Sequence, residues 1–518
     1  MKKLVLMILG CMCLIGCTSN QAVIQKDDSN AVLIELSDEQ ILIDGSTESQ
    51  SVSLDKKIIY YEDGKDETYG EGSKEDAHSL QEAELHTVVT IHQPGIYRVS
   101  GKLSYGQIAI DLGENAIKDP EAVVVLILDN VDLTCTVAPA IIVYNAYECA
   151  ESTKDHPTKQ VDLTGAGFHL VLEKDSINNI QGAYVAKIYQ PETEEKLHKY
   201  DAAIESLVSL NITGTGTLNL TAQNEGIETK MHMHIHSGNL NISSADDSLN
   251  AGEDGVSVIR ISDGVVVCDS NLGNEGDGID SNGWLIIEGG TVVAYANEKS
   301  QDSGIDSDNG IIIDGGNVLA TGNMLDQISQ ESSQHVMVLQ SMTPFDKDTV
   351  LVLKQDEQVA AALKSSADWS VLVYSSDELK EADYTLWEAS EVQGQWVSGL
   401  MMNPDSVTLE TQLSHSGMQM GQGNHQPMGM MNPEGIEHPE GFDPKQHPEG
   451  WSEEDFGKHP QTGFVPGPMQ GNMEILEGSE QEIQNRPDYQ FGKLDSSQSS
   501  TVFTLRKNQY MFIITNLK

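Results

Sequence analysis

The chain has 518 residues, a formal charge of −50 and 5% aromatic residues, with 30 Lys and Arg against 80 Asp and Glu. A field of this sign repels nucleic acids and anionic membrane surfaces, so nucleic-acid binding is excluded. Clustered carboxylates are suited to hard cations such as Ca²⁺, although acids that only keep an exported protein soluble are the alternative.

Residues 1–16 have the pattern of an export signal. Lys2 and Lys3 precede an apolar run that ends in Leu14-Ile-Gly-Cys17 and is too short to span a bilayer. Small residues before a cysteine resemble the bacterial lipobox, which implies cleavage before Cys17 and a lipid on its sulfur; an ordinary signal peptide is the alternative. We therefore expect an exported lipoprotein, anchored to the cell membrane through Cys17 and facing the extracellular side.

Residues 17–40 are polar and are expected to form a tether, and short β-type runs follow. The runs are separated by glycines, as in a turn-rich all-β protein. Cys135, Cys149 and Cys268 are too widely spaced for a disulfide framework, so buried thiols are favoured over a Cys135–Cys149 bridge. The pattern predicts strands at 41–43, 58–61, 87–91, 97–100, 107–111, 123–128 and 141–144.

A fivefold repeat occupies residues 201–322. Each copy joins acidic and small residues to one aliphatic anchor, as in Asp201-Ala-Ala-Ile204-Glu-Ser, and two alternating β runs follow it. The anchors are spaced by 23, 22, 30 and 26 residues, which is too short for a propeller blade, and no leucine-rich register is present. Three short strands per copy predict a parallel β-helix over residues 41–325, with rungs of three strands. The anchors are Ile204, Ile227, Leu249, Ile279 and Ile305.

The repeat stops after Gly322. Runs at 349–353, 369–374, 384–387, 501–505 and 510–515 predict a small terminal β unit that comprises residues 326–400 and 500–518. Between its two parts, residues 401–499 are rich in Met, His, Pro and Gly, and this composition is typical of a disordered insertion. Copper binding through its Met and His side chains is the alternative to a flexible linker.

The acids of the repeat stack in columns if the rungs lie about 4.8 Å apart. Neighbouring like charges at that distance repel, so the columns require a cation or raised pKa values. Calcium accepts oxygen ligands in irregular geometry, whereas a solvated acidic edge with Asx turns is the alternative. We expect calcium as the cofactor, held by Asp246, Asp247, Asp277, Asp280, Asp302 and Asp306.

Several side chains are expected on the outer surface of the coil, where a glycan could bind. Trp284 and Tyr295 fall at outward positions and are suited to stacking on sugar rings, and Arg260 could pair with a uronate. His232, His234 and His236 alternate with core residues, so a sugar-contacting or solvated face is favoured over a transition-metal site. The candidate ligand-binding residues are Trp284, Tyr295, Arg260 and His234; isolated exposed side chains are the alternative.

The segments Pro94-Gly-Ile-Tyr-Arg-Val-Ser-Gly, Gly106-Gln-Ile-Ala-Ile-Asp111 and Val123-Val-Val-Leu-Ile-Leu-Asp-Asn-Val-Asp132, followed by the repeats, carry a family resemblance. Residues 30–325 resemble the β-helix carbohydrate-binding domain of clostridial secreted proteins. The resemblance implies a right-handed parallel β-helix of the pectate-lyase type, bound calcium, and binding of cellulose or acidic plant sugars. The Met- and His-rich insertion and the long third repeat depart from that pattern.

Three functions follow from these features. The first is non-catalytic, calcium-dependent binding of a polysaccharide at the cell surface by a monomeric lipoprotein. The second is a polysaccharide lyase in which calcium assists proton removal beside a uronate and Arg260 is the base. The third is a structural or adhesive surface protein. We favour the first, because few basic residues lie near the acids.

Overall fold

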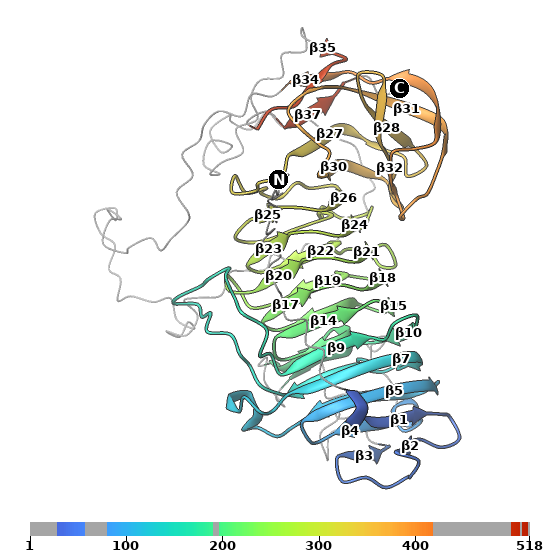
Figure 1. Ribbon diagram of the computed structural model, residues 1–518, viewed down its shortest axis with the longest axis vertical. Helices are drawn as coiled ribbons and strands as arrows, with labels where there is room; N and C mark the ends of the chain where they lie inside the picture. The colour runs from blue at the N-terminus through green and yellow to red at the C-terminus, as the bar shows by residue number, and fades with distance from the viewer. Residues whose placement is uncertain (1–27, 57–79, 190–195, 418–498, 508–509, 516–518) are drawn as a thin grey trace, which may run out of the picture. The chain divides into compact units, whose positions relative to one another are not determined.

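The computed structural model describes residues 28–56, 80–189, 196–417, 499–507 and 510–515, which are nearly all β with long parallel sheets (Figure 1). Helical turns in this part are α1 Leu80–Ala83, η1 Asp28–Asn30 and η2 Ala116–Lys118. None of these is long and apolar enough to cross a membrane. The export signal, Cys17, the strand expected at 58–61 and residues 418–498 lie outside the described residues.

One parallel ladder, here called the first ladder, contains the strands that carry the aliphatic anchors of the first four repeats; the fifth anchor, Ile305, follows β22 outside a strand. Its strands pair in parallel from one repeat to the next, with Ile204 beside Ile227 and Leu249 beside Ile279. At its beginning, β3 Val52–Asp55 pairs antiparallel with β4. The strands are β4 Thr87–Ile91, β6 Gly106–Asp111, β8 Ile141–Asn145, β13 Ala202–Ser206, β16 Glu225–Thr229, β19 Leu249–Ala251 and β22 Ile279–Ser281.

The second ladder is formed by the first β run after each anchor. Its strand β9 pairs in parallel with the first half of a long strand, β7 Val124–Thr134. The strand β7 in turn pairs in parallel with β5 Gly95–Leu103. Equivalent residues of successive repeats lie side by side throughout. The strands are β9 Phe168–Leu172, β14 Leu210–Gly214, β17 His232–Ile235, β20 Val258–Ile261, β23 Trp284–Ile287 and β25 Ile311–Ile313.

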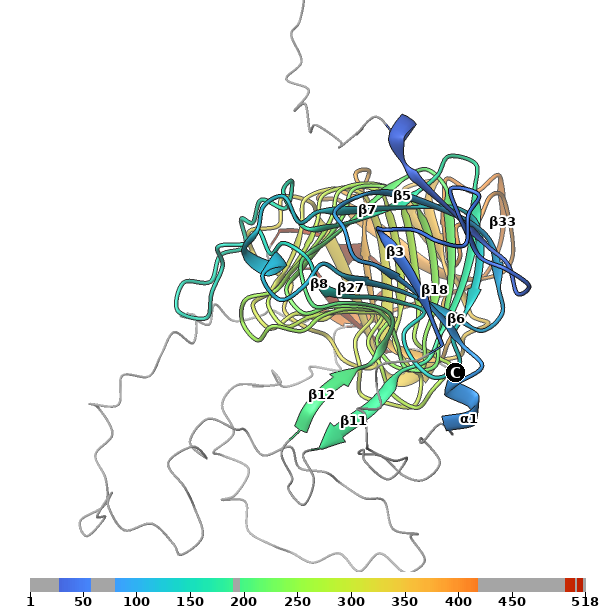
Figure 2. The ribbon, with the colours of Figure 1, turned by 90° about the horizontal axis from the view of Figure 1, so that it is seen from below.

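The third ladder is formed by the second β run of each repeat and grows on the other end of β7. Seen from below, strands of the ladders surround a common interior (Figure 2). The hairpin of β11 Val185–Tyr189 and β12 Lys196–Tyr200 projects outward from the coil. The strands are β10 Ile177–Gly182, β15 Thr217–Ala222, β18 Asn239–Ser243, β21 Val265–Asp269, β24 Thr291–Tyr295 and β26 Asn317–Gly322.

Alternation explains the core between the ladders. The five anchors are buried together with the alternating aliphatic residues of both following runs, as the period of two predicts. Burying one such side chain contributes roughly 1.5–3 kcal/mol, so repetition of the pattern stabilises the stack. Gly290 and Gly316 turn the chain between ladders with positive φ, and a Cβ at Gly316 would lie 2.7 Å from the Gly290 carbonyl oxygen.

The tether prediction for residues 17–40 is wrong for β1 Val32–Leu36. This strand pairs in parallel with β5 and antiparallel with β2 Leu42–Ile43. Ile34 and Leu36 point into the core while Leu33 and Glu35 are exposed, so an alternating pattern was present in the sequence. This alternating run has only five residues, and the polar residues around it favoured the prediction of a tether.

The terminal unit continues from the last strand of the third ladder. β30 Trp369–Ser375 pairs antiparallel with β26 and with β27 Val336–Phe345, and β37 Met511–Ile514 pairs in parallel with β27. A six-stranded sheet completes the unit. The expected start of the insertion at residue 401 is wrong, because strands β32, β33 and β34 lie between residues 400 and 417. The remaining strands are β28 Val350–Gln355, β29 Gln358–Leu363, β31 Asp383–Gln393, β32 Leu400–Met402, β33 Ser406–Gln412, β34 His415–Gly417, β35 Ser499–Ser500 and β36 Phe503–Thr504.

Candidate functional site

Acidic side chains gather along one edge of the first ladder, here called the acidic edge. The register of β16, β19 and β22 places Asn250 directly between Glu228 and Asp280. Asp247 and Asp277 precede β19 and β22, and oxygen atoms of Asp247, Asp277 and Asp280 lie within 4.8 Å of one another. A second group with the same spacing contains Asp201, Glu225 and Glu228.

Backbone donors fix these carboxylates from one repeat to the next. The N–H of Asp277 donates to Oδ1 of Asp247 at 2.7 Å, and the N–H of Ser303 donates to Oδ1 of Asp277. In the same region, Oδ2 of Asp302 accepts from the N–H of Gly276 at 2.7 Å. The acids are therefore part of the turn structure and have defined positions.

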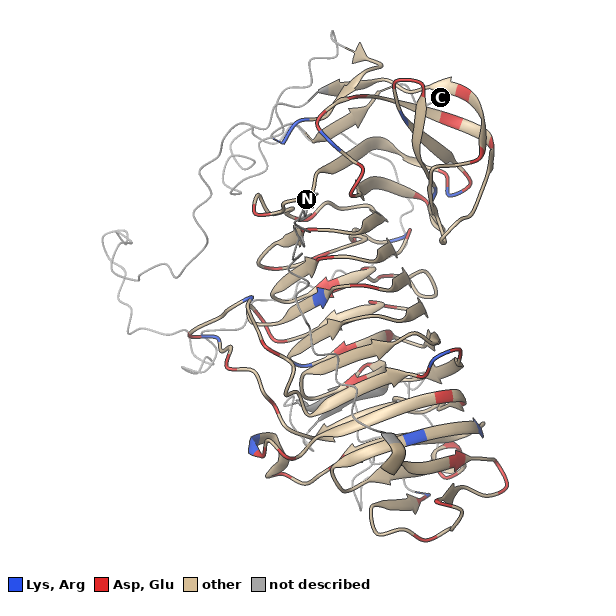
Figure 3. Cartoon of the chain, in the orientation of Figure 1, with Lys and Arg blue, Asp and Glu red and all other residues tan. Residues whose placement is uncertain are grey.

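Burial raises the pKa of these acids. The pKa of Asp277 rises to about 10, first because it is desolvated and then because the Asp247 charge lies beside it. Desolvation and the Asp306 charge raise the pKa of Asp280 to about 7, and the pKa of Asp247 is raised by burial and by Asp246. Acidic residues occur along the whole described chain, whereas Lys and Arg are few (Figure 3). A cation close to these carboxylates would favour their charged form at neutral pH.

The structure brings together three of the six expected calcium ligands, Asp247, Asp277 and Asp280. The other three contribute through their charges: Asp246 and Asp302 raise the pKa of Asp247, and Asp306 raises that of Asp277. The oxygens of Asp246, Asp302 and Asp306 do not share the 4.8 Å group among the described residues. The six expected ligands therefore interact through their charges, but only Asp247, Asp277 and Asp280 form a compact group.

The expected glycan-contacting face on the second ladder is covered by residues 146–166, here called the strap. Both oxygens of the Glu148 carboxylate accept hydrogen bonds from Ser209, from its N–H at 2.7 Å and its hydroxyl at 2.9 Å. Further along the strap, the Leu163 carbonyl accepts from Asn211 at 2.7 Å. Val161 packs on an apolar patch of the same face that contains Val258. The strap therefore closes this face.

The expectation that the histidines form an open face is wrong because the strap covers them. Their side chains do point away from the core, as the alternation requires, yet His232 is 0% and His234 8% exposed. His234 bonds to the Ser262 hydroxyl and its ring lies 3.5 Å from that of His236 between centroids. Desolvation lowers the pKa of His232 to about 4 and that of His234 to about 3, so both are neutral at neutral pH.

Arg260 is fixed beneath the strap and its side chain is 18% exposed. Its guanidinium pairs with Glu288 and donates to the Lys159 carbonyl at 3.1 Å. A guanidinium has only N–H donors and no acceptor lone pair, so this side chain is poorly suited to abstract a proton. Trp284 is half-buried against the same apolar patch of Val258, Ile286 and Ile312, so it is only partly available for stacking on a sugar ring.

Tyr295 is 2% exposed, which corrects its expected place as an open stacking residue. It does project from the outer side of β24, but the terminal unit packs over it. Leu319, Leu339 and Leu372 belong to the same buried cluster, and the Tyr295 hydroxyl lies 3.0 Å from that of Ser398. The aromatic ring therefore joins the third ladder to the terminal unit.

A family model described as carbohydrate-binding domain-containing protein matches residues 85–368, which is more than half of the chain. The chain belongs to this family. The matched region contains the three ladders from β4 onward, the strap and the acidic edge, and it ends at the beginning of β30. The acidic edge and the strap therefore lie within the carbohydrate-binding domain-containing region.

Among solved structures, the chain is similar to one described as the polysaccharide lyase-like protein from C. thermocellum, gadolinium derivative. The identity is 18%, the TM-score is 0.33, and the match covers 58% of this chain and 97% of that one. No curated protein matches the chain.

Sequence reasoning did not include several acids of the edge in the expected site. Asp326 follows the last repeat and its pKa is raised to about 7, by burial and by Asp306. Asp326 lies outside the repeat pattern, so no sequence signal identified it. Asp201, Glu225 and Glu228 occupy repeat positions and were visible as part of the columns, but their grouping depends on the register of β13 on β16.

Proposed function

We propose that this protein is a non-catalytic, calcium-dependent polysaccharide-binding protein of the cell surface. Its family supports a carbohydrate partner. The passage of four successive repeats through three parallel ladders supports the finer assignment of a right-handed parallel β-helix with three-strand rungs, on which the acids of successive repeats are brought together.

The observation that carries the calcium assignment is the group formed by Asp247, Asp277 and Asp280, whose oxygens lie within 4.8 Å. Three carboxylates offer only hard oxygen donors, which Ca²⁺ prefers. Asn250 lies in register beside Asp280, and its buried Oδ1 accepts no hydrogen bond within the described residues. An amide oxygen in this place is a further donor for a hard cation. Calcium bound there would supply the positive charge that these acids lack.

A bound cation also gives the acidic protein a way to hold an acidic glycan. With a formal charge of −50, the protein repels a uronate polymer unless a cation lies between them. Calcium held by Asp280 and its neighbours can accept a sugar carboxylate among its ligands, since Ca²⁺ takes 6–8 oxygens and the compact group offers fewer. The lyase alternative is less favoured, because Arg260 is engaged with Glu288 and the strap.

The remaining parts of this proposal concern residues outside the described part of the chain. A lipid on Cys17 would anchor the protein to the cell membrane, on the extracellular side. Mass spectrometry of the protein purified from membranes tests this anchor, because cleavage before Cys17 and acylation change the mass of the N-terminal peptide. Sedimentation of the exported chain tests whether it is a monomer.

Calorimetric titration tests the calcium site directly. Calcium should bind the full exported chain, and Asp280→Asn should weaken that binding by about tenfold or more because a charged ligand is lost. Asp263→Asn is the matched control, since Asp263 is exposed and only caps its own turn. Binding of polygalacturonate should require calcium and disappear in EDTA; binding that persists in EDTA would overturn the calcium-bridging role.

A further inference from the structure

A second surface of the coil, on the third ladder, is open and free of charged side chains. Strands β10, β15 and β18 alternate buried and outward residues, so their outward side chains form three neighbouring rows. Here this surface is called the amide face. Its outward residues are Ile177, Asn179, Gln181, Thr217, Asn219, Thr221, Asn239, Asn241 and Ser243.

The middle row of the amide face is a ladder of side-chain amides. Asn219 donates to the Asn179 amide oxygen at 3.0 Å, and Asn241 donates to that of Asn219 at 3.0 Å. On the neighbouring strands, the row continues as Asp132 and Lys102, which pair at 2.9 Å. Asn219 and Asn241 each use one side-chain N–H within the ladder, so each keeps a second N–H and oxygen lone pairs for a ligand.

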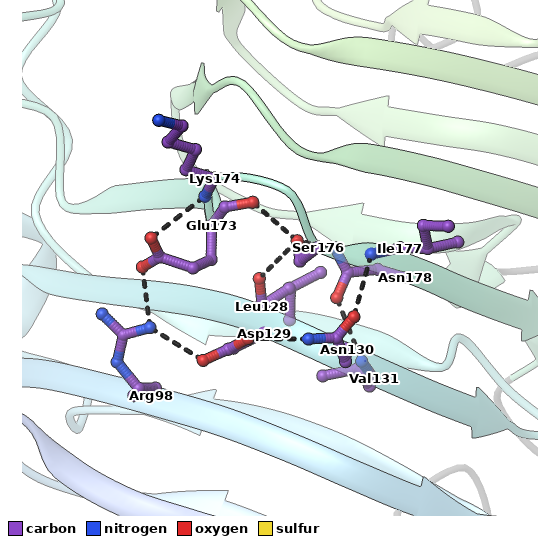
Figure 4. Close-up of polar contacts among 10 residues, drawn as sticks. All are labelled: Arg98, Leu128, Asp129, Asn130, Val131, Glu173, Lys174, Ser176, Ile177 and Asn178. Atoms are coloured by element: carbon purple, nitrogen blue, oxygen red, sulfur yellow. Dashed lines mark hydrogen bonds and ion pairs between the residues drawn. The ribbon is translucent and has the colours of Figure 1, made fainter.

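A polar corner fixes the first strand of the amide face (Figure 4). The Asn130 amide oxygen accepts from the N–H of Ile177 at 3.2 Å, and Asn178 accepts from the N–H of Val131 at 3.0 Å. Arg98 joins the two sides of the corner through Asp129 and Glu173. The donors and acceptors of the face are therefore held before a ligand arrives, which reduces the entropy that binding costs.

We propose that the amide face binds an extended, uncharged polysaccharide whose chain runs along the Asn179–Asn219–Asn241 ladder. The strand spacing of about 4.8 Å is close to the length of one hexose residue in an extended chain, so successive sugars meet equivalent amides. Nine outward positions without a charge, in a chain with 80 acids, favour a neutral ligand over a cation or uronate. This inference rests on the proposed polysaccharide-binding function and gives it a site separate from the acidic edge.

The composition of the amide face disfavours a protein partner. Protein interfaces depend on a few buried anchors, mostly Trp, Tyr and Arg. The amide face has none of these, and Ile177, 57% exposed, is its one large apolar side chain. Hydroxyl-rich ligands instead require many small donors and acceptors, which Asn, Gln, Thr and Ser provide.

Affinity measurements with cellohexaose, xylohexaose and mannohexaose test this site on the full exported chain, each with calcium and with EDTA. We expect at least one of these neutral oligomers to bind equally in both conditions. The double variant Asn219→Ala with Asn241→Ala should weaken that binding by about tenfold or more, because several hydrogen bonds are lost. Asn309→Ala should not, since Asn309 is exposed and bonded once, to Gly255, outside the face.

Thr221→Lys is a second variant that keeps the amide ladder and places a long side chain across an exposed part of the face. It should block binding without changing the melting temperature. The inference is overturned if no neutral oligomer binds, if both variants bind as well as the original chain, or if Thr221→Lys abolishes only self-association. Calcium-dependent binding of polygalacturonate would survive all of these results, so the two proposals fail separately.

Discussion

The backbone N–H of Asp277 donates to the Asp247 carboxylate at 2.7 Å, so the acid of one repeat is held by the backbone of the next. This bond favours the charged form of Asp247, but burial and the Asp246 charge outweigh it and the pKa is raised. The acidic edge therefore combines precise positions with unfavourable charge, and the balance depends on pH and on cations.

Without calcium, the protein should lose stability as the pH rises. Asp280 and Asp326 have pKa values near 7 in the folded chain and near 3.9 when unfolded, so the folded state binds more protons between these values. Their contribution is complete below the unfolded pKa and is lost as the pH rises through the folded one. Thermal unfolding in EDTA should show a lower melting temperature at pH 8 than at pH 5, and calcium should restore it at pH 8.

Tyr295 should matter for stability and not for glycan binding. Tyr295→Ala removes a buried ring between the third ladder and the terminal unit, so it should cost about 3–5 kcal/mol. Tyr295→Phe keeps the ring and removes the hydroxyl contacts with Ser398 and the Gly399 backbone, so it should cost about 1 kcal/mol. Urea unfolding measures both costs. An unchanged unfolding midpoint with reduced glycan affinity would instead favour an open stacking residue.

Gly278 should not tolerate a larger residue. A Cβ there would lie 2.4 Å from the Gly304 carbonyl oxygen and 2.9 Å from the Ala294 Cβ, so successive repeats would be forced apart. Gly278→Ala should therefore lower the free energy of unfolding by about 1–3 kcal/mol. Gly165→Ala is the matched control, because its nearest neighbour would be the Cys149 Cβ at 4.0 Å. Equal melting temperatures for the two variants would contradict the packing described here.

The strap should open when its anchor is removed. Glu148→Ala deletes both bonds to Ser209, so trypsin should cleave after Lys154 or Lys159 about tenfold faster or more. The control is Glu151→Ala, because Glu151 is exposed in the same segment. Peptide mapping of brief digests gives the rates. If both variants are cut as slowly as the original chain, Glu148 is not the anchor.

The repeat core was predictable because its signal is local. Whether Ile204 or Ile227 faces inward depends only on the alternation along a few residues, and both are buried as expected. The same reasoning placed Asp247, Asp277 and Asp280 in one neighbourhood, because equivalent positions stack once the repeat is established.

What covers the outer faces was not predictable from the same pattern. The strap meets the second ladder through Glu148 and Ser209, which are 61 positions apart, and Tyr295 meets Ser398 across 103 positions. Alternation along a strand distinguishes side chains that point into the core from those that point outward. It does not predict whether an outward side chain contacts water or another segment of the chain. His234, Arg260 and Tyr295 were misjudged for this reason.

The antiparallel strand at the last repeat has a consequence for solubility. A stack of parallel strands would otherwise end in a row of open backbone donors and acceptors on β26, able to template another copy. β30 takes that place and runs in the opposite direction, with Val371 beside Gly322 and Ser375 beside Val318. The edge of β26 is thereby closed, so another copy of the chain cannot add to the stack through this strand.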